Sequence, residues 1–430
     1  MWVPGSLFFL LPAIGFAYKL LASPSRAVVS RRRVRRPHVL PDIDLRPVRR
    51  FARLLMLIAA IAITVDAFTG WRSAANAVWF EWRAVGVLAL LTAGNFFCMA
   101  CPLVFVRDLA RRFVSPAFAW PSRLRNKWMA VGFFAAWLFG YAKFSLWNRP
   151  IATAWIIIGY FIAILVIDCI FTGASFCKYV CPVGQFNFLV SCMSPREIGL
   201  RDRRVCASCH THDCIRGNES SRGCELSLFQ PTKVGNLDCT FCLDCVSACP
   251  SSNVSIVPVS MLRTISADEP RSGIGRISAR NDVAALALVF ALGAFANACW
   301  MLDAGAGLRI FLTAAPAAFV SICFTANVAI VDSRQAFRVM RRVALAITPV
   351  GTAMWMAHLF SHAAPMFLSV TSIRDVQILA LDAGFLLSIA AIWKVTNRLA
   401  LAIPWQLLCV FLYSAGIWMV FQPMKMTITR

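Results

Sequence analysis

CTFCLDCVSACP, residues 239–250, carries four cysteines at the spacing C-x2-C-x2-C-x3-C and ends in proline. Its cysteines are Cys239, Cys242, Cys245 and Cys249. Bacterial ferredoxins use this spacing, in which three thiolates on a tight loop bind one [4Fe–4S] cubane and the fourth reaches a neighbouring cluster. A structural zinc site uses two separate CxxC pairs and does not need the third close cysteine or the Cys-Pro ending. The stretch therefore predicts iron–sulfur ligands.

A second set of cysteines precedes this run and would complete a two-cluster domain. Its members are Cys206, Cys209, Cys214 and Cys224. By the crossover rule of two-cluster ferredoxins, the first cluster would be held by Cys206, Cys209, Cys214 and Cys249. The second cluster would then be held by Cys224, Cys239, Cys242 and Cys245. An uncrossed arrangement, in which each run holds its own cluster, stays open as the alternative.

The composition indicates a membrane protein. Of the 430 residues 59% are hydrophobic and 15% are charged, and the mean hydropathy is +0.68. A soluble domain of this length would need a far more polar surface. The net charge of +23 does not indicate nucleic-acid binding, because the arginines flank apolar stretches instead of forming one continuous face.

Ten apolar stretches are long enough, at about 20 residues each, to span or nearly span a bilayer. They lie near 5–22, 54–71, 84–104, 127–147, 151–172, 283–302, 308–331, 343–362, 376–393 and 402–421. The first lacks a basic leader and a small-residue cleavage site, so we expect it to be a retained helix.

Lys and Arg are concentrated in the loops after the first, third and seventh stretches, which the positive-inside rule places in the cytoplasm. Arg72 and Arg83 fall in one of the poorer, outer loops. Both termini would then be periplasmic, and the protein would lie in a bacterial inner membrane. The predicted fold is an all-α polytopic membrane protein of about ten helices with an inserted small α+β ferredoxin-like domain. Its parts are a five-span half at 1–172, a cytoplasmic [4Fe–4S] domain at 173–282 and a second five-span half at 283–430.

CASCH, residues 206–210, also matches the attachment motif of a c-type haem. Covalent haem attachment takes place outside the cytoplasmic membrane, whereas the arginine pattern puts this stretch inside. Haem c is therefore not expected. His210 and His212 are interpreted as polar loop residues near a cluster.

Two further cysteine pairs stand at predicted helix ends and are each followed by proline. They are Cys98 and Cys101 in FFCMACP, and Cys177 and Cys181 in FCKYVCP. Spacings of three and four residues would put both sulfurs of a pair on one helical face, and the prolines would disfavour continuation of the helix. The four thiols could form a redox pair or a third metal site, or they could be small buried packing residues. The isolated cysteines are taken as packing residues: Cys169, Cys192, Cys299, Cys323 and Cys409.

Polar residues within the predicted spans give weaker signals. His358 and His362 lie one turn apart and could serve a metal, a quinone or a proton, or could simply end a helix. Asp382 lies deep in its span and is a candidate proton or quinone group. Asp66 and Asp168 lie near helix ends and are expected to reach the interface.

The Cys-Pro pairs followed by ferredoxin-type runs resemble the membrane-bound [4Fe–4S] polyferredoxins of the NapH/NosR group over residues 54–255. The resemblance implies electron transfer between a quinol pool, or cytoplasmic donors, and periplasmic redox enzymes. The chain departs from the group at its first pair, which has two intervening residues instead of three.

These features predict an iron–sulfur electron-transfer protein that relays electrons between a cytoplasmic donor and a membrane acceptor, most simply quinone, or a periplasmic redox partner. No catalytic residue is predicted. The alternative is a redox sensor or a maturation factor for another metalloenzyme. A transporter is disfavoured, because the two halves show no inverted repeat.

Overall fold

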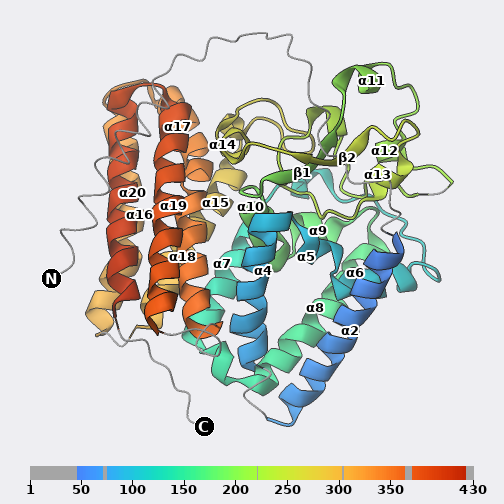
Figure 1. The fold of residues 1–430 in the computed structure, drawn as a ribbon, viewed down its shortest axis with the longest axis horizontal. Helices are drawn as coiled ribbons and strands as arrows, with labels where there is room; N and C mark the ends of the chain where they lie inside the picture. Colours follow the sequence, from blue (N-terminus) through green and yellow to red (C-terminus); the bar gives the residue numbers. More distant parts are fainter. Residues whose placement is uncertain (1–45, 71–74, 220, 303–304, 364–369, 423–430) are drawn as a thin grey trace. The chain divides into compact units, whose positions relative to one another are not determined.

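The computed structural model describes residues 46–70, 75–219, 221–302, 305–363 and 370–422. The stretch near 5–22, predicted to be the first span, lies outside these residues. In the described part the chain is mostly helical, with one two-stranded sheet (Figure 1).

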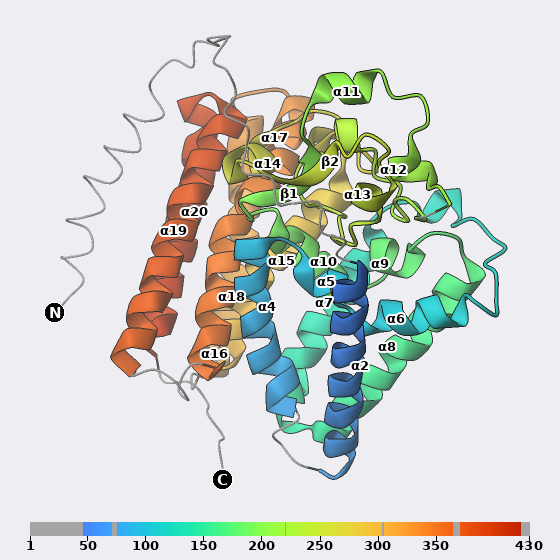
Figure 2. The same cartoon turned by 45° about the vertical axis from the view of Figure 1, so that its right-hand side comes forward.

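The front part of the chain forms helices from long apolar runs, which must satisfy their backbone hydrogen bonds internally in an apolar environment. They are α2 (Arg46–Phe68), α4 (Trp82–Ala93), α5 (Phe96–Met99), α6 (Pro102–Ala110), α7 (Trp128–Lys143) and α8 (Pro150–Ile170). A π-helical turn, η1 (Ala77–Glu81), leads directly into α4. Helices α2 and α8 lie side by side, and α6 packs against both (Figures 1 and 2).

The cysteine-rich part that follows has short elements joined by loops. Its helices are α9 (Ser175–Tyr179), α10 (Pro182–Ser191), α11 (Arg203–Ala207), α12 (Asp213–Arg216), α13 (Asp244–Ala248) and α14 (Met261–Ser266). Strands β1 (Arg196–Leu200) and β2 (Val254–Pro258) pair antiparallel, with Ile198 opposite Ile256. Ile198 and Val254 are buried and anchor the sheet in the same apolar cluster as several cysteines.

The back part is a set of longer helices. They are α15 (Asn281–Trp300), α16 (Ala306–Val328), α17 (Ser333–Ala346), α18 (Thr348–Ala363), α19 (Val370–Thr396) and α20 (Leu399–Val420). Helix α18 packs against α19 and α15, and α15 also contacts α7 of the front part. Alanine at many inward positions of α15, such as Ala287, Ala291 and Ala294, lets neighbouring helices approach closely.

Seven helices of the described residues are long and apolar enough to cross a membrane, and a bent pair would make eight. They are Arg46–Phe68, Pro150–Ile170, Asn281–Trp300, Ala306–Val328, Ser333–Ser361, Ser372–Thr396 and Leu399–Val420. These helices correspond to seven of the ten predicted spans. The predicted span near 127–147 is a helix of 16 residues, α7.

The predicted span at 84–104 is not one straight helix. The chain turns by 109° between Ala93 and Phe96. Gly94 causes the break with a φ of +87°, and Asn95 begins α5 by accepting a hydrogen bond from the Cys98 backbone N–H. The apolar run continues through the bend. Hydropathy does not depend on backbone conformation, so it predicts one continuous span here.

Replacing Gly94 by alanine is expected to destabilise the protein by about 1–3 kcal/mol, because a Cβ would overlap the Phe241 ring and the left-handed φ disfavours an L side chain. The matched control is Gly132→Ala in α7, where a Cβ meets open space and which should be neutral or slightly stabilising. Thermal unfolding in detergent compares the two. Equal unfolding temperatures would contradict the steric role of Gly94.

Arg83, predicted to lie in an outer loop, is in the first turns of α4 instead. Its guanidinium lies 4.9 Å from the centre of the Trp137 ring and 5.0 Å from that of Trp355. Aromatic faces attract a cation, so rings from α7 and α18 accommodate a charge that hydropathy alone assigns to solvent.

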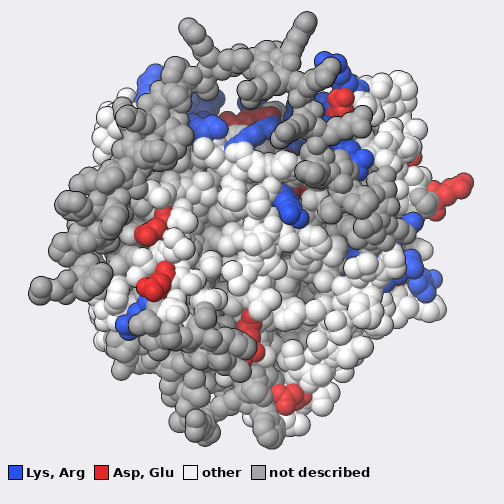
Figure 3. Space-filling model, viewed as in Figure 1, with Lys and Arg blue, Asp and Glu red and all other residues white. Residues whose placement is uncertain are grey.

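The charged side chains are unevenly distributed on the face drawn in Figure 3. Lys and Arg gather mainly toward the upper end, where Figure 1 places α14, α17 and the cysteine-rich part. The described surface below is largely uncharged. This distribution is typical of a membrane protein with one strongly basic side.

Candidate iron–sulfur sites

The first group of thiols surrounds Cys214, which is buried at α12. Burial raises the pKa of Cys214 to about 11, and the nearby thiols of Cys206, Cys249 and Cys209 add to the rise. Burial also raises the pKa of Cys206, and the nearby thiols of Cys209 and Cys249 raise it further. Cys249, from the second run of the sequence, therefore lies with the first set.

The second group surrounds Cys245, at α13. Burial raises the pKa of Cys245 well above its usual value, and Cys242, Cys224 and Cys239 contribute further. The same four residues line one small cavity. The grouping in space is thus that of the crossed arrangement, with Cys224 beside the second run and Cys249 beside the first.

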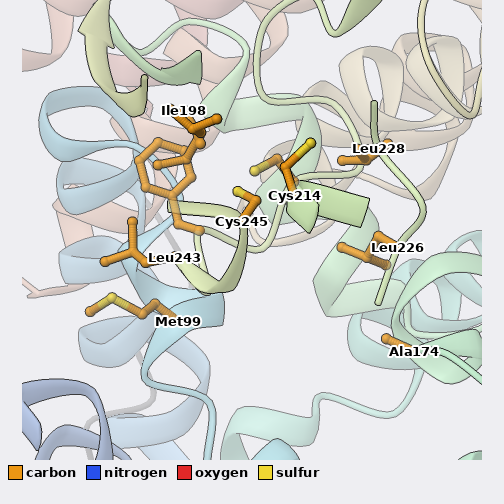
Figure 4. Packing of buried hydrophobic residues seen from close by; sticks show 11 residues of the cluster. Met99, Ala174, Ile198, Cys214, Leu226, Leu228, Leu243 and Cys245 are labelled. Carbon is orange, nitrogen blue, oxygen red and sulfur yellow. The ribbon is translucent and has the colours of Figure 1, made fainter. Parts of the chain in front are cut away.

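The two groups are neighbours. Cys214 and Cys245 belong to one buried cluster, and Figure 4 shows them close together. Leu226, Leu228 and Ala174 lie to one side of them, and Met99 and Leu243 lie to the other (Figure 4). The second group is more buried, whereas Cys206 and Cys209 of the first are partly exposed.

Left-handed residues shape the loop that carries the second group. Asp238, Phe241 and Leu243 have φ values of 64°, 54° and 65°. These turns interrupt regular structure, so that the loop presents several thiols to one point. Asp238 is held by an ion pair with Lys127 at the start of α7, and Asn95 donates to the Cys239 carbonyl at 2.8 Å.

N–H groups point at several sulfur atoms. Gln230 Nε2 lies 3.5 Å from Cys245 Sγ, the Leu228 backbone N lies 3.4 Å from Cys224 Sγ, and the Asn253 backbone N lies 3.4 Å from Cys249 Sγ. Such donors stabilise thiolates, and hydrogen bonds to sulfur tune iron–sulfur centres.

The donor set is made of thiols, which suit an iron–sulfur cluster. Among the described residues, no group of three or more His, Cys, Asp or Glu side chains is arranged to hold a single metal ion. Thiolates of a zinc site share one ion at about 2.3 Å, whereas each thiolate of a cubane binds a different iron. Two groups of four thiols, partly supplied with N–H donors, are the ligands that two cubanes require.

The Cys-Pro pairs differ from their prediction. Cys98 lies in α5 while Cys101 precedes α6, and Cys177 lies in α9 while Cys181 precedes α10. The sulfurs of a pair therefore do not share one helical face. Each proline is the first residue of the next helix, Pro102 of α6 and Pro182 of α10. The fixed φ and the missing N–H of proline suit this first helical position.

Ion pairs join the cysteine-rich part to the helices. Arg107 of α6 is almost fully buried and pairs with Asp108, Asp168 and Glu225. Asp168, predicted to reach the interface, is instead fully buried at the end of α8, where its other oxygen accepts from the Phe176 N–H at 2.8 Å. Arg222 adds an exposed bridge to Asp108 at 2.9 Å.

Two buried arginines of helix α2 lie beside the second group: Arg49 contacts it directly, and Arg53 lines the same cavity. Arg49 pairs with Asp244 at 2.7 Å and donates to the Cys242 carbonyl. Arg53 donates to the Met99 carbonyl at 2.9 Å. In the sequence, both arginines belong to the basic residues after the first predicted span, which indicate only orientation; their one-turn spacing at the start of an apolar helix is the signal that marks them.

The remaining candidates are dispersed. His358 is buried in α18, while the side chain of His362 lies outside the described residues. Asp382 accepts a hydrogen bond of 2.5 Å from the Tyr413 hydroxyl, and Asp66 is half-buried. Phe229 lies against His212 in the loop around the first group, and His210 is exposed. Four of the isolated cysteines are buried, as packing residues would be: Cys192, Cys299, Cys323 and Cys409.

Comparison with known proteins finds one partial relative. No family model matches the chain, and no solved structure does. Over 91 residues the chain is 31% identical to an Escherichia coli K12 protein named "Putative electron transport protein YccM". The match covers 21% of this chain and 23% of that protein, so it spans less than a quarter of the relative.

Proposed function

We propose that this chain is a membrane electron-transfer protein with two [4Fe–4S] clusters, one in each group of four thiols. The observation that carries the proposal is the meeting of eight cysteines in two adjacent groups, beside helices long enough to cross a membrane. Similarity to a protein named for electron transport supports the same function. The resemblance of its cysteine motifs to those of the NapH/NosR group also supports this function.

Once bound, the clusters would supply one-electron redox chemistry. The chain provides the rest: Cys239 and Cys245 are buried and exclude water, and N–H groups at their neighbours favour the more negative, reduced state. Arg49 and Arg53 bring positive charge beside the second group. Because the first group is the more exposed, its cysteines would hold the cluster that a soluble redox donor can approach, and the more buried second group would hold the other.

We place the cysteine-rich part in the cytoplasm of a bacterium, with the protein in the inner membrane. The basic side of the molecule in Figure 3 supports this orientation. The donor would be a cytoplasmic redox protein, and the acceptor quinone or a periplasmic redox enzyme. A redox sensor or maturation factor is the rival, since it would hold the same clusters without sustained turnover.

Anaerobic purification and metal analysis test the two-cluster proposal. We expect at least about eight irons and eight sulfides per chain, with magnetically coupled cubane signals after dithionite reduction. Zinc in place of iron, or stoichiometric haem, would contradict it. Steady reduction of a soluble quinone analogue by the dithionite-reduced protein supports the relay, whereas a single oxidation without turnover supports the sensor.

A further inference from the structure

We propose that Cys98, Cys101, Cys177 and Cys181 hold a third iron–sulfur cluster, which connects the second thiol group to the membrane-crossing helices. This inference rests on the proposed electron-transfer function and adds a site to it. It assigns a role to the two breaks in the helical part, at α5–α6 and at α9–α10.

The two breaks have the same local structure although they lie far apart in the sequence. In each, a short helix carries the first cysteine, and the second cysteine precedes a proline that begins a longer helix. Cys101 has φ −58° and ψ 122°, and Cys181 has φ −62° and ψ 110°. The same backbone conformation therefore presents a thiol at the start of α6 and at the start of α10.

Side-chain contacts bring the two breaks together. Asn187 of α10 donates to Cys98 Sγ at 3.4 Å, across 89 positions of the chain. Cys101, Cys177 and Cys181 pack in one buried cluster with Val104 and Phe176. The four thiols thus converge from two different helix pairs.

The surroundings suit thiolates that bind iron. The Gly184 backbone N–H donates to Cys181 Sγ at 3.2 Å. Cys181 is buried, and Cys101 and Cys177 are partly buried against the same cluster.

This third group adjoins the second. Cys98 and Cys177 line the same cavity as Cys224, Cys239 and Cys245. Arg53, Arg107 and Glu225 also line it. One electron would leave the second cluster, oxidising one Fe(II) equivalent there, and reduce one Fe(III) equivalent in the third, with no bond formed or broken.

A double variant, Cys101→Ser with Cys181→Ser, tests the proposal through its iron content. The wild-type protein is expected to contain about ten or about twelve irons per chain, for a [2Fe–2S] or a [4Fe–4S] third cluster. The variant should contain about eight and lose one Mössbauer component, while both cubane signals of the cysteine-rich part persist. Cys299→Ser with Cys409→Ser, two buried cysteines outside the groups, is the matched control and should keep the wild-type content.

The outcomes separate this inference from the function on which it rests. Wild-type protein with about eight irons and two cubane signals would overturn the third cluster and leave the two-cluster relay standing. One zinc per chain that is lost in the double variant would also overturn it. Where the variant does not fold, Mössbauer spectra of the wild-type protein decide alone, because a third cluster adds a component beyond two cubanes.

Discussion

Cys245→Ser is expected to remove one cubane, lowering the iron content by about four per chain. The Cys245 thiol is buried among Cys242, Cys224 and Cys239, so a hard, poorly ionised serine hydroxyl would leave one iron without its ligand. Iron analysis and reduced EPR spectra measure the loss. Cys192→Ser is the control, because Cys192 is equally buried but its Sγ lies 3.2 Å from the Phe188 carbonyl, outside the groups. Unchanged iron in Cys245→Ser would contradict the second cluster.

The same measurement separates the crossed arrangement from the uncrossed one. If Cys224 and Cys245 hold one cluster, as their proximity indicates, the double variant Cys224→Ser with Cys245→Ser should lose no more iron than Cys245→Ser alone. If each run holds its own cluster, the double variant should lose about eight irons. Cys249→Ser with Cys245→Ser reverses the expectation, since Cys249 lies with Cys206 and Cys214 in the crossed arrangement and would share a cluster with Cys245 in the uncrossed one.

Arg107→Met is expected to destabilise the protein by about 3–5 kcal/mol, because it leaves Asp168 buried without its cationic partner. Arg107 also pairs with Glu225 at 2.7 Å, so the variant weakens the attachment of the cysteine-rich part to α6 and α8. Burial would raise the pKa of Glu225, but Arg107 and Arg222 outweigh it and hold that pKa below its usual value. The carboxylate therefore stays charged and loses a partner in the variant.

Arg222→Met is the matched control for Arg107→Met. It removes ion pairs to the same carboxylates, Asp108 and Glu225, but its side chain is 48% exposed. Exposed pairs contribute about 0–1 kcal/mol, so only a small effect is expected. Thermal unfolding in detergent, followed by cluster absorbance, compares the two variants. Equal destabilisation by the two variants would contradict the prediction that burial of the Arg107 ion pairs determines the size of the effect.

The sequence by itself determined the features that depend only on residues close to one another in the chain. Apolar runs predicted where most long helices lie, because hydropathy is a local property. The spacing of the cysteines from Cys239 to Cys249 predicted iron–sulfur ligands, because thiol spacing within a short loop limits which ligand sets can form. The sequence also contains two Cys-Pro pairs, but it does not distinguish a helix start from a helix end at Pro102 and Pro182, because proline is compatible with both positions.

Only the tertiary structure decided which distant residues meet. It placed Cys249 beside Cys214 and Cys224 beside Cys245, and it brought Asn187 to Cys98. It also turned arginines that the sequence offered only as orientation signals into buried partners, as Arg49 is for Asp244 across 195 positions. Such pairings depend on how helices pack and on where buried charges find compensation, and neither is encoded in a local pattern. Local spacing predicted which cysteines are candidate ligands, and long-range packing determined which of them lie together.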